Sequence, residues 1–293
     1  MRTYLDCLPC FVRQALDAAR LVGAGEDLSE RVLREVLDAA GRMDYNRPPP
    51  EMGQYIHRLV REMADAPDPY AGIKRRFNDM ALRVLPQLRE RVRRAEDPFE
   101  AAVRLAITGN LIDFGTASGV DEDEVLQAVD WALEKPMEGD AGSLVEAVVQ
   151  ADSILYLFDN AGEIVFDRLL LELLPLDRVV GAVKPSPIIN DATLEDAHYC
   201  GITELIPVVE TGSDAPGAVL EDCGKEFLER FRRTDLILAK GQGNYEALSH
   251  TDKEAFFLLK AKCAVVARDL GCPQGTMMLT GTGSGKGSDA LRC

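Results

Sequence analysis

Residues 153–163 read SILYLFDNAGE, an apolar run that stops at the carboxylate of Asp159. An uninterrupted apolar run of this kind is typical of a strand covered on both faces, as in a parallel sheet. A helical apolar pattern over 163–174 follows directly. Since α/β folds bind ligands at the carboxyl ends of parallel strands, Asp159 and Asn160 are predicted to lie in a functional site.

The rest of the second half alternates in the same way between short apolar runs and helical patterns. We expect strands at 153–158, 178–183, 204–209, 236–239 and 255–259, and helices at 163–174, 192–200, 224–231, 245–248 and 261–270. This alternation predicts βαβ units and a mainly parallel sheet with helices on both faces, which is a three-layer α/β domain.

The first half has a different rhythm, because its apolar residues recur at helical spacing. Helices are expected near 4–19, 28–40, 51–64, 70–85, 99–112 and 122–133, and no strand is expected before residue 150. Pro136, Gly139 and Gly142 mark a break between the two rhythms. The prediction is an α-helical N-terminal domain at 1–142, followed by a metal- and phosphate-binding α/β domain at 143–293.

Composition and charge narrow the range of partners. The 293 residues include 33 basic and 49 acidic side chains, a formal net charge of −16, and 46% are hydrophobic. This hydrophobic fraction supports a sizeable core and argues against disorder. The negative charge argues against nucleic acid and anionic membrane as partners, since both would repel the protein. With no apolar run of ~18 residues and no signal peptide, the expected location is the cytoplasm, and the oligomeric state stays open.

Polar clusters follow three of the predicted strands. Their sequences are DNAGE at 159–163, KPSPIINDATLED at 184–196 and KGQGNYE at 240–246. Asp159 and Asp191 are one βαβ unit apart. If their strands are neighbours, the backbones run only ~5 Å apart. The two acidic loops can then converge on one small ion or group.

The residue types in these loops predict a site for a hard cation and a phosphoryl group. Asp159, Asn160 and Asp191 offer oxygen donors, which suit Mg²⁺ or Mn²⁺ better than zinc. The three histidines show no paired spacing for a zinc site. Lys184 and Lys240 would supply positive charge beside the ion. Backbone amides at the helix start after Gly162 could hold the same anion, and Gly241 would let the main chain approach closely.

Each feature also has a structural explanation. Asp159-Asn160 and Asn190-Asp191 could be helix N-caps, and Thr193 with Asp196 resembles a capping pair. Single lysines at strand ends are more often solvated than bound to a ligand. The recurrence of polar clusters at three strand ends favours the joint functional interpretation.

The three motifs Asp159-Asn160-Ala-Gly162-Glu163, Lys184-Pro-x-Pro-x-x-Asn190-Asp191-x-Thr193 and Lys240-Gly-Gln-Gly-Asn244-Tyr-Glu closely resemble those of the damage-control metabolite phosphatases, long known as domain of unknown function 89. The helical half is similar too, with Cys7-x-x-Cys10, Asp68-Pro-Tyr-x-x-x-Lys74-x-x-x-Asn78 and Gly109-Asn110-Leu-Ile-Asp113. The Cys-x-x-Cys start resembles the archaeal and bacterial branch. The resemblance covers nearly the whole chain.

The resemblance implies metal-dependent hydrolysis of phosphate monoesters on small, often damaged metabolites, such as sugar phosphates or phosphopantetheine derivatives. It implies Asp159, Asn160 and Asp191 as ligands of a divalent ion (Mg²⁺, Mn²⁺, Co²⁺ or Ni²⁺). It also implies Lys240 as a phosphate clamp, with Asn244 in the same motif. We add Lys184, Asn190 and Gly241 as expected phosphate-binding positions.

Two features of the expected mechanism stay open. Glu163 or Asp191 could orient an attacking water as a base, or Asp159 could attack phosphorus itself; direct attack by water is preferred. Asn110 and Asp113, three residues apart on an expected helix, could close over the site or could form a polar contact between domains.

Two other functions compete with a phosphatase. A carboxyl methyltransferase using S-adenosylmethionine would need a glycine-rich cofactor turn, which does not follow the first strand of the second half. A non-catalytic protein that binds a phosphorylated metabolite would need only the binding groups. Cys7 and Cys10 are expected to be a packed structural pair, with redox chemistry and half of a zinc site as weaker alternatives.

Overall fold

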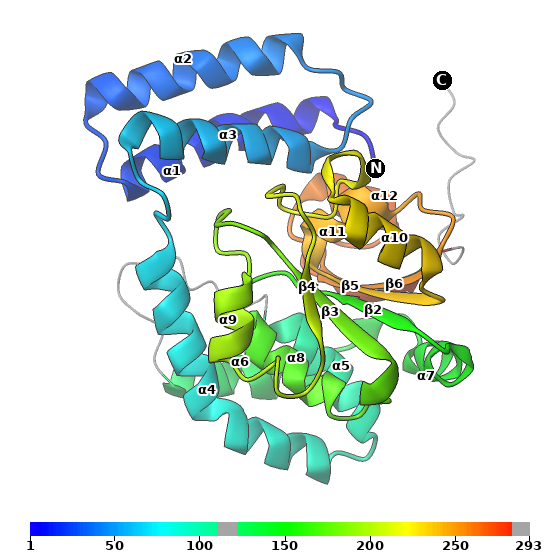
Figure 1. The fold of residues 1–293 in the computed structure, drawn as a ribbon. Helices are drawn as coiled ribbons and strands as arrows, with labels where there is room; N and C mark the ends of the chain where they lie inside the picture. Colours follow the sequence, from blue (N-terminus) through cyan, green and yellow to red (C-terminus); the bar gives the residue numbers. More distant parts are fainter. Residues whose placement is uncertain (110–121, 283–293) are drawn as a thin grey trace.

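The computed structural model describes residues 1–109 and 122–282, and a seven-stranded sheet lies at its centre (Figure 1). The strand order is β1-β7-β6-β5-β2-β3-β4. All neighbouring pairs are parallel except β6 and β7, which run antiparallel. The strands are β1 (Met137–Glu138), β2 (Ile154–Leu157), β3 (Val179–Val183), β4 (Val208–Glu210), β5 (Leu236–Lys240), β6 (Glu254–Lys260) and β7 (Met277–Gly281). The predicted mainly parallel sheet is confirmed.

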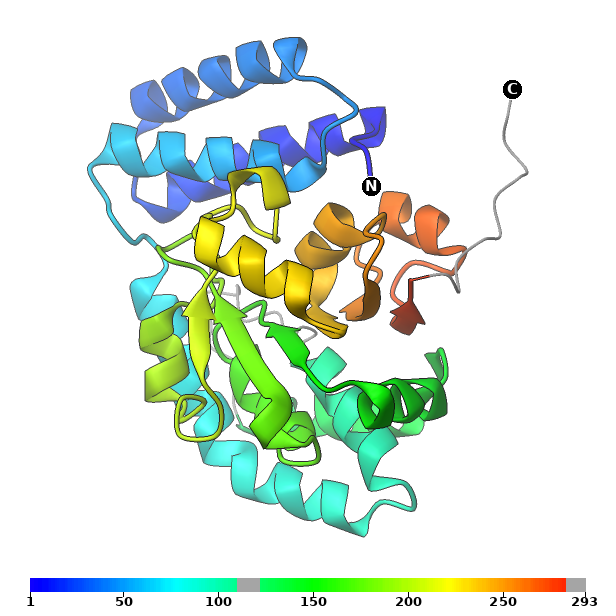
Figure 2. The same cartoon turned by 45° about the vertical axis from the view of Figure 1, so that its right-hand side comes forward.

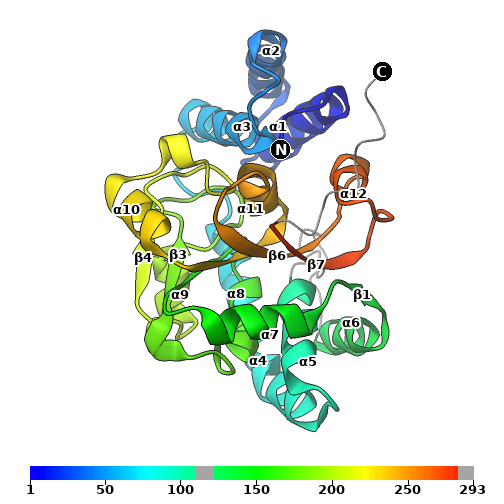
Figure 3. The same cartoon turned by 90° about the vertical axis from the view of Figure 1, so that its right-hand side faces the viewer.

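Helices cover both faces of the sheet, which gives the three layers that the alternation predicts (Figure 3). One face packs against α4 (Ala71–Arg94), α5 (Pro98–Thr108), α6 (Glu122–Glu134), α7 (Ala141–Gln150), α8 (Glu163–Leu171) and α9 (Leu194–Tyr199). The other face packs against α10 (Lys225–Arg233), α11 (Gly241–Leu248) and α12 (Ala264–Leu270).

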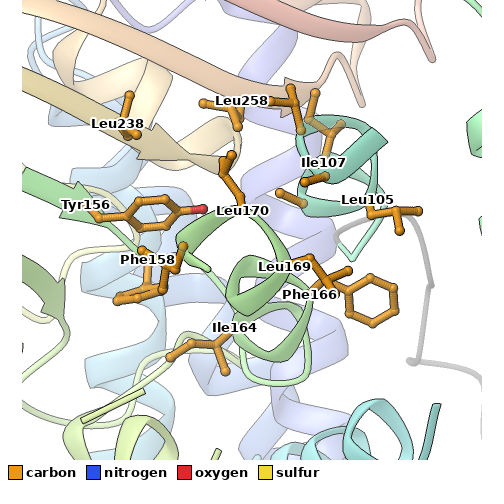
Figure 4. Close-up of a cluster of buried hydrophobic side chains, with 14 of the residues drawn as sticks. Leu105, Ile107, Tyr156, Phe158, Ile164, Phe166, Leu169, Leu170, Leu238 and Leu258 are labelled. Atoms are coloured by element: carbon orange, nitrogen blue, oxygen red, sulfur yellow. The ribbon is translucent and has the colours of Figure 1, made fainter. Parts of the chain in front are cut away.

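The period-2 geometry of strands explains why one short segment supports two cores. In β2, Ile154 and Tyr156 belong to the core that the sheet shares with α4 to α9. Leu155 and Leu157 belong to the core on the opposite face, which includes α10 to α12. Figure 4 shows Tyr156 beside Leu170 of α8 in the first of these cores. Since all four β2 side chains are buried, the segment needs the continuous apolar run that the sequence shows.

The first three helices form a separate layer above the carboxyl ends of the strands (Figures 1 and 2). They are α1 (Leu8–Leu21), α2 (Glu26–Arg42) and α3 (Pro49–Ala64), which we call the helical bundle. The chain then descends through α4 to the opposite face of the sheet (Figure 1). The bundle therefore faces the edge of the sheet at which the polar clusters lie.

Several predicted elements need correction. The expectation of no strand before residue 150 is wrong, because β1 pairs with β7 through Met137 and Glu138. A two-residue strand buries too little side chain to leave a pattern, and it lies in the stretch that was interpreted as a break. The helix α7 and the strand β7 were not predicted. The expected strand at 204–209 begins only at Val208, and α11 already starts at Gly241.

The proposed division of the chain at residue 142 stays a prediction. Helices α4 to α6 contribute to the same buried cluster as the sheet, so much of the segment 1–142 shares a core with the segment that follows. In the two described ranges, no helix combines the length and apolar character that a membrane crossing requires.

Cys7 and Cys10 differ in their surroundings. Cys7 is buried in the cluster between the bundle and the sheet, whereas Cys10 is exposed, so the two do not pack as a unit. Burial raises the pKa of the Cys7 thiol, and the neighbouring Glu246 carboxylate acts in the same direction. A raised pKa lowers the thiolate fraction, which disfavours redox chemistry at this pair.

Candidate active site

The loops after β2 and β3 meet directly, because these strands are parallel neighbours in register. Asn160 and Asp191 form an isolated antiparallel bridge. The amide of Ala161 donates to the carbonyl of Asn190 at 2.8 Å, and the amide of Ala192 donates to that of Asp159 at 2.7 Å. The structure thus brings Asp159, Asn160, Asn190 and Asp191 together, and main-chain hydrogen bonds fix the arrangement.

The two carboxylates of this arrangement lie in unfavourable surroundings. Burial, together with the charges of Glu163 and Asp191, raises the pKa of Asp159 well above its usual range. Burial raises the pKa of Asp191 to about 7, although the Lys184 and Lys74 ammonium groups oppose the shift. Two acidic groups in adjoining loops, with Asp191 buried and Asp159 partly buried, favour either a shared proton or a bound cation.

The donor set fits a divalent ion such as Mg²⁺. One carboxylate oxygen of Asp191, Oδ2, is buried without a hydrogen-bond partner, and the ammonium of Lys184 lies 3.9 Å away. Within residues 1–109 and 122–282, no group of three or more His, Cys, Asp or Glu side chains could hold a metal. Asp159, Asn160 and Asp191 are two carboxylates and an amide, which is sufficient for Mg²⁺ because this ion keeps several water ligands.

Lys240 ends β5 and is completely buried. Its ammonium donates to Glu163 Oε1 at 2.6 Å, to Asp167 Oδ1 at 2.7 Å and to the carbonyl of Ala106 at 2.7 Å. Burial alone would lower the pKa of Lys240, but the charges of Asp167 and Glu163 raise it above its usual value. All three N–H donors are occupied, so this geometry leaves none for the phosphate that the resemblance assigns to Lys240.

Glu163 connects Lys240 to the acidic loops. Its second carboxylate oxygen accepts a hydrogen bond from Asn160 Nδ2 at 3.0 Å, and the same amide nitrogen donates to Asp159 Oδ2 at 2.8 Å. Asp167, one helical turn later, also accepts from the Tyr156 hydroxyl at 2.8 Å. Asp167 was missed by the sequence reasoning, although a carboxylate four residues after Glu163 in an apolar helix was a usable signal.

Lys184 is the second lysine of the site and has different surroundings. It follows β3, and its side chain is 4% exposed. Among the described residues its ammonium makes no hydrogen bond, and the 3.9 Å contact with Asp191 is its ion pair. A buried ammonium with donors to spare beside a carboxylate is suited to a third, anionic group.

The third motif lies beside Asp159. Gly241 has φ +78°, and a Cβ built at this position would lie 1.9 Å from Asp159 Oδ2, so only glycine fits there. Asn244 is buried and uses its side chain internally: Nδ2 donates to the carbonyl of Lys240 at 2.8 Å, and Oδ1 accepts from the amide of Ala218 at 3.0 Å. These contacts fix the start of α11 rather than offering a ligand-binding group.

Two predicted site residues, Asn110 and Asp113, lie outside the described residues. Gly109, which precedes them, packs against Glu163, since a Cβ there would approach the Glu163 Cα to 3.0 Å. The Thr193–Asp196 capping pair is confirmed as a capping box at the start of α9.

The site is acidic and rich in oxygen donors, and it lies at the carboxyl ends of parallel strands in an α/β protein, with the buried Lys184 beside it. The model of the damage-control phosphatase ARMT1-like domain matches residues 3–278, and the chain belongs to this family.

Relatives of known sequence and structure agree with this assignment. A damage-control phosphatase from Pyrococcus horikoshii is 36% identical over 95% of this chain and 97% of its own length. A damage-control phosphatase from Archaeoglobus fulgidus is 36% identical over 93% of this chain and 96% of its own length. The crystal structure of a DUF89 family protein from Pyrococcus horikoshii superimposes with a TM-score of 0.87, at 34% identity over 95% of this chain and 98% of that one.

Proposed function

We propose that this protein is a divalent-metal-dependent phosphatase that hydrolyses phosphate monoesters of small, possibly damaged metabolites, such as sugar phosphates or phosphopantetheine-like compounds, in the cytoplasm. The names of the two phosphatase relatives support the reaction class. The observation that carries the proposal is the buried Oδ2 of Asp191, which has no hydrogen-bond partner and lies 3.9 Å from the Lys184 ammonium, because a cation and an anion would complete this arrangement.

Asp159, Asn160 and Asp191 would hold the ion, which could be Mg²⁺, Mn²⁺, Co²⁺ or Ni²⁺. When bound, such an ion polarises a phosphoryl oxygen and lowers the pKa of a coordinated water. Lys184 would bind the phosphoryl oxygens, since its ammonium has donors available. In this assignment Lys240 does not touch the substrate but fixes Glu163 through the 2.6 Å hydrogen bond.

Glu163 is the base in the proposed reaction. Its carboxylate is clamped between Lys240 and Asn160, so its orientation towards the acidic loops is fixed before the substrate binds. Water attacks phosphorus and passes a proton to Glu163 while the ester P–O bond breaks. The departing alkoxide takes a proton from solvent to become an alcohol, inorganic phosphate is released, and Glu163 returns its proton to solvent. The positive charge of Lys184 stabilises the charge on the phosphoryl oxygens during this exchange.

The test is hydrolysis of p-nitrophenyl phosphate by the purified protein with Mg²⁺, Mn²⁺, Co²⁺ or Ni²⁺, before and after EDTA. We expect turnover with at least one ion, its loss in EDTA and its recovery when the ion is returned. The Asp159→Asn variant should lose roughly 100-fold or more of this activity, a loss typical of a removed catalytic contact. It should fold at least as stably without metal, because it removes one of several crowded negative charges.

Turnover that survives EDTA, or no turnover with any ion over a panel of phosphorylated metabolites, would contradict the proposal. Metal-dependent binding of a phosphate ester without hydrolysis would instead identify the non-catalytic binding protein. Full activity in Asp159→Asn would exclude Asp159 from the site.

A further inference from the structure

Asn78 of α4 contacts the loop after β2 and the helix α9, although it lies far from both in sequence. Its side chain is buried, with 2% exposed. Its Oδ1 accepts a hydrogen bond from the amide of Gly162 at 2.7 Å, and its Nδ2 donates to Asp196 Oδ1 at 2.8 Å. One amide group therefore joins the loop after β2 to the helix that follows the loop after β3.

The first of these contacts acts on the turn that contains Asp159 and Asn160. Gly162 has φ +77°, and a Cβ at this position would lie 2.8 Å from the Cβ of Phe77, so α4 is packed directly against the turn. The amide that Asn78 binds is the second peptide after Asn160. A shift of the Asn78 side chain would therefore move Gly162, and with it Asn160, which lies two residues earlier in the same turn.

The second contact acts on the segment that follows Asp191. The Asp196 carboxylate also accepts from the amide of Thr193 at 2.9 Å and pairs with the Lys74 ammonium at 2.7 Å. The side chain of Lys74 is 6% exposed, and that of Asp196 is 8% exposed. Since Asp196 caps α9 and also binds α4 through two residues, it anchors the chain just after Asp191 to the same helix that holds Gly162.

We propose that Asn78 is a positioning residue that sets the distance between the Asp159–Asn160 and Asp191 loops, and so the affinity of the site for its divalent ion. This inference rests on the proposed function, because it assigns those three residues to the ion. Asn78 itself touches neither the ion nor the substrate. Partners that orient metal ligands indirectly typically change metal affinity by about 10–100-fold when they are removed.

The experiment compares Asn78→Ala with a matched control, Val84→Ala. Val84 is equally buried, lies six residues further along α4 in the hydrophobic core, and its apolar side chain cannot bond to either loop. The dissociation constant of Mn²⁺ is measured by titration calorimetry without substrate, and kcat and KM for p-nitrophenyl phosphate are measured at saturating Mn²⁺. Melting temperatures are recorded with and without the ion.

We expect Asn78→Ala to weaken Mn²⁺ binding about tenfold or more and to reduce the rise in melting temperature that Mn²⁺ causes. Saturating Mn²⁺ should restore much of its kcat. Val84→Ala should melt at a lower temperature but bind Mn²⁺ as the unaltered protein does. Asn78→Ser, which keeps a polar group in the buried position, replaces the alanine variant if that one does not fold, with the same expectation.

Mn²⁺ affinity unchanged in the Asn78 variant, or reduced equally in Val84→Ala, would overturn the inference and leave the proposed function intact. Failure of both Asn78 variants to fold would show that this residue serves folding in general, and would also overturn the inference. If the unaltered protein neither binds Mn²⁺ nor hydrolyses the ester, the proposed function fails instead.

Discussion

Lys240 shows at the residue scale how a buried charge is accommodated. Its ammonium has no contact with water, and its charge is balanced by the carboxylates of Glu163 and Asp167. Breaking a buried ion pair by removing one partner costs more than the pair contributes, because the remaining charge stays in a medium of low dielectric. Here two carboxylates depend on one ammonium.

We predict that Lys240→Met lowers the free energy of unfolding by about 3–5 kcal/mol, because Glu163 and Asp167 would be left unpaired. Urea denaturation followed by circular dichroism measures the change. Lys225→Met, at an exposed position on α10, serves as the control and should stay within about 0.5 kcal/mol of the unaltered protein. A Lys240→Met variant as stable as this control would show that the buried network does not need its cation.

At the scale of the element, α3 combines an apolar face with one buried histidine. His57 is 3% exposed, its Nε2 has no hydrogen-bond partner, and its ring contacts that of Tyr70 edge to face at 5.8 Å between centroids. Burial, with a smaller contribution from the Arg61 charge, lowers the pKa of His57 to about 4. The folded protein therefore holds this side chain neutral at pH values where the unfolded chain binds a proton.

The sign of the pH dependence follows from this difference. Above pH 6.5 both states hold a neutral imidazole, and the stability is complete. As the pH falls from 6.5 towards 4, only the unfolded state takes up the proton, so stability is lost. Between pH 7.5 and pH 5 we expect His57 to remove roughly 2 kcal/mol from the free energy of unfolding. The difference in unfolding free energy between the protein and His57→Gln, measured at both pH values, isolates this contribution. A difference that does not change with pH would contradict the expectation.

At the scale of the whole molecule, one carboxylate accepts hydrogen bonds from three side chains of the bundle. Asp214 is 6% exposed and accepts hydrogen bonds from Arg58, Arg61 and Gln54 of α3. Arg61 also donates to the carbonyl of Pro187, in the loop that leads to Asp191. Burial alone would raise the pKa of Asp214, but these hydrogen bonds outweigh it and lower the pKa to about 2.

We predict that Asp214→Ala weakens the docking of the bundle more than it weakens the sheet. Loss of a charged acceptor in this partly exposed cluster should cost roughly 2–3 kcal/mol. Hydrogen exchange should become faster in α1 to α3 while β2 and β5 keep their protection. The control is Glu221→Ala, which removes an exposed partner of Arg47 from the same surface. Equal acceleration throughout the molecule would exclude a local role for Asp214.

Local patterns predicted the parts of this fold that form from contiguous sequence. The apolar run of β2, the helical spacing of α2, α3 and α6, and the Thr193–Asp196 capping box all follow from side chains close in sequence. The strand β1 was missed because two residues make no pattern without β7, which lies about 140 residues later. The start of α11 was missed because Gly241 and Gly243 have low helix propensity, whereas packing decides their conformation.

In the candidate site, too, some features follow from the sequence and others from the tertiary structure. The sequence by itself determined the chemical types, since hard oxygen donors and lysines stand at strand ends whatever their exact placement. Only the tertiary structure decided which lysine has donors to spare, because that depends on whether a carboxylate from another element reaches the ammonium. Glu163 and Asp167 of α8 reach Lys240, while within the described part of the chain the ion pair of Lys184 is the one with Asp191 at 3.9 Å. The role of Asn78 likewise depends on the tertiary structure, because its two partners, Gly162 and Asp196, lie 84 and 118 residues away along the chain.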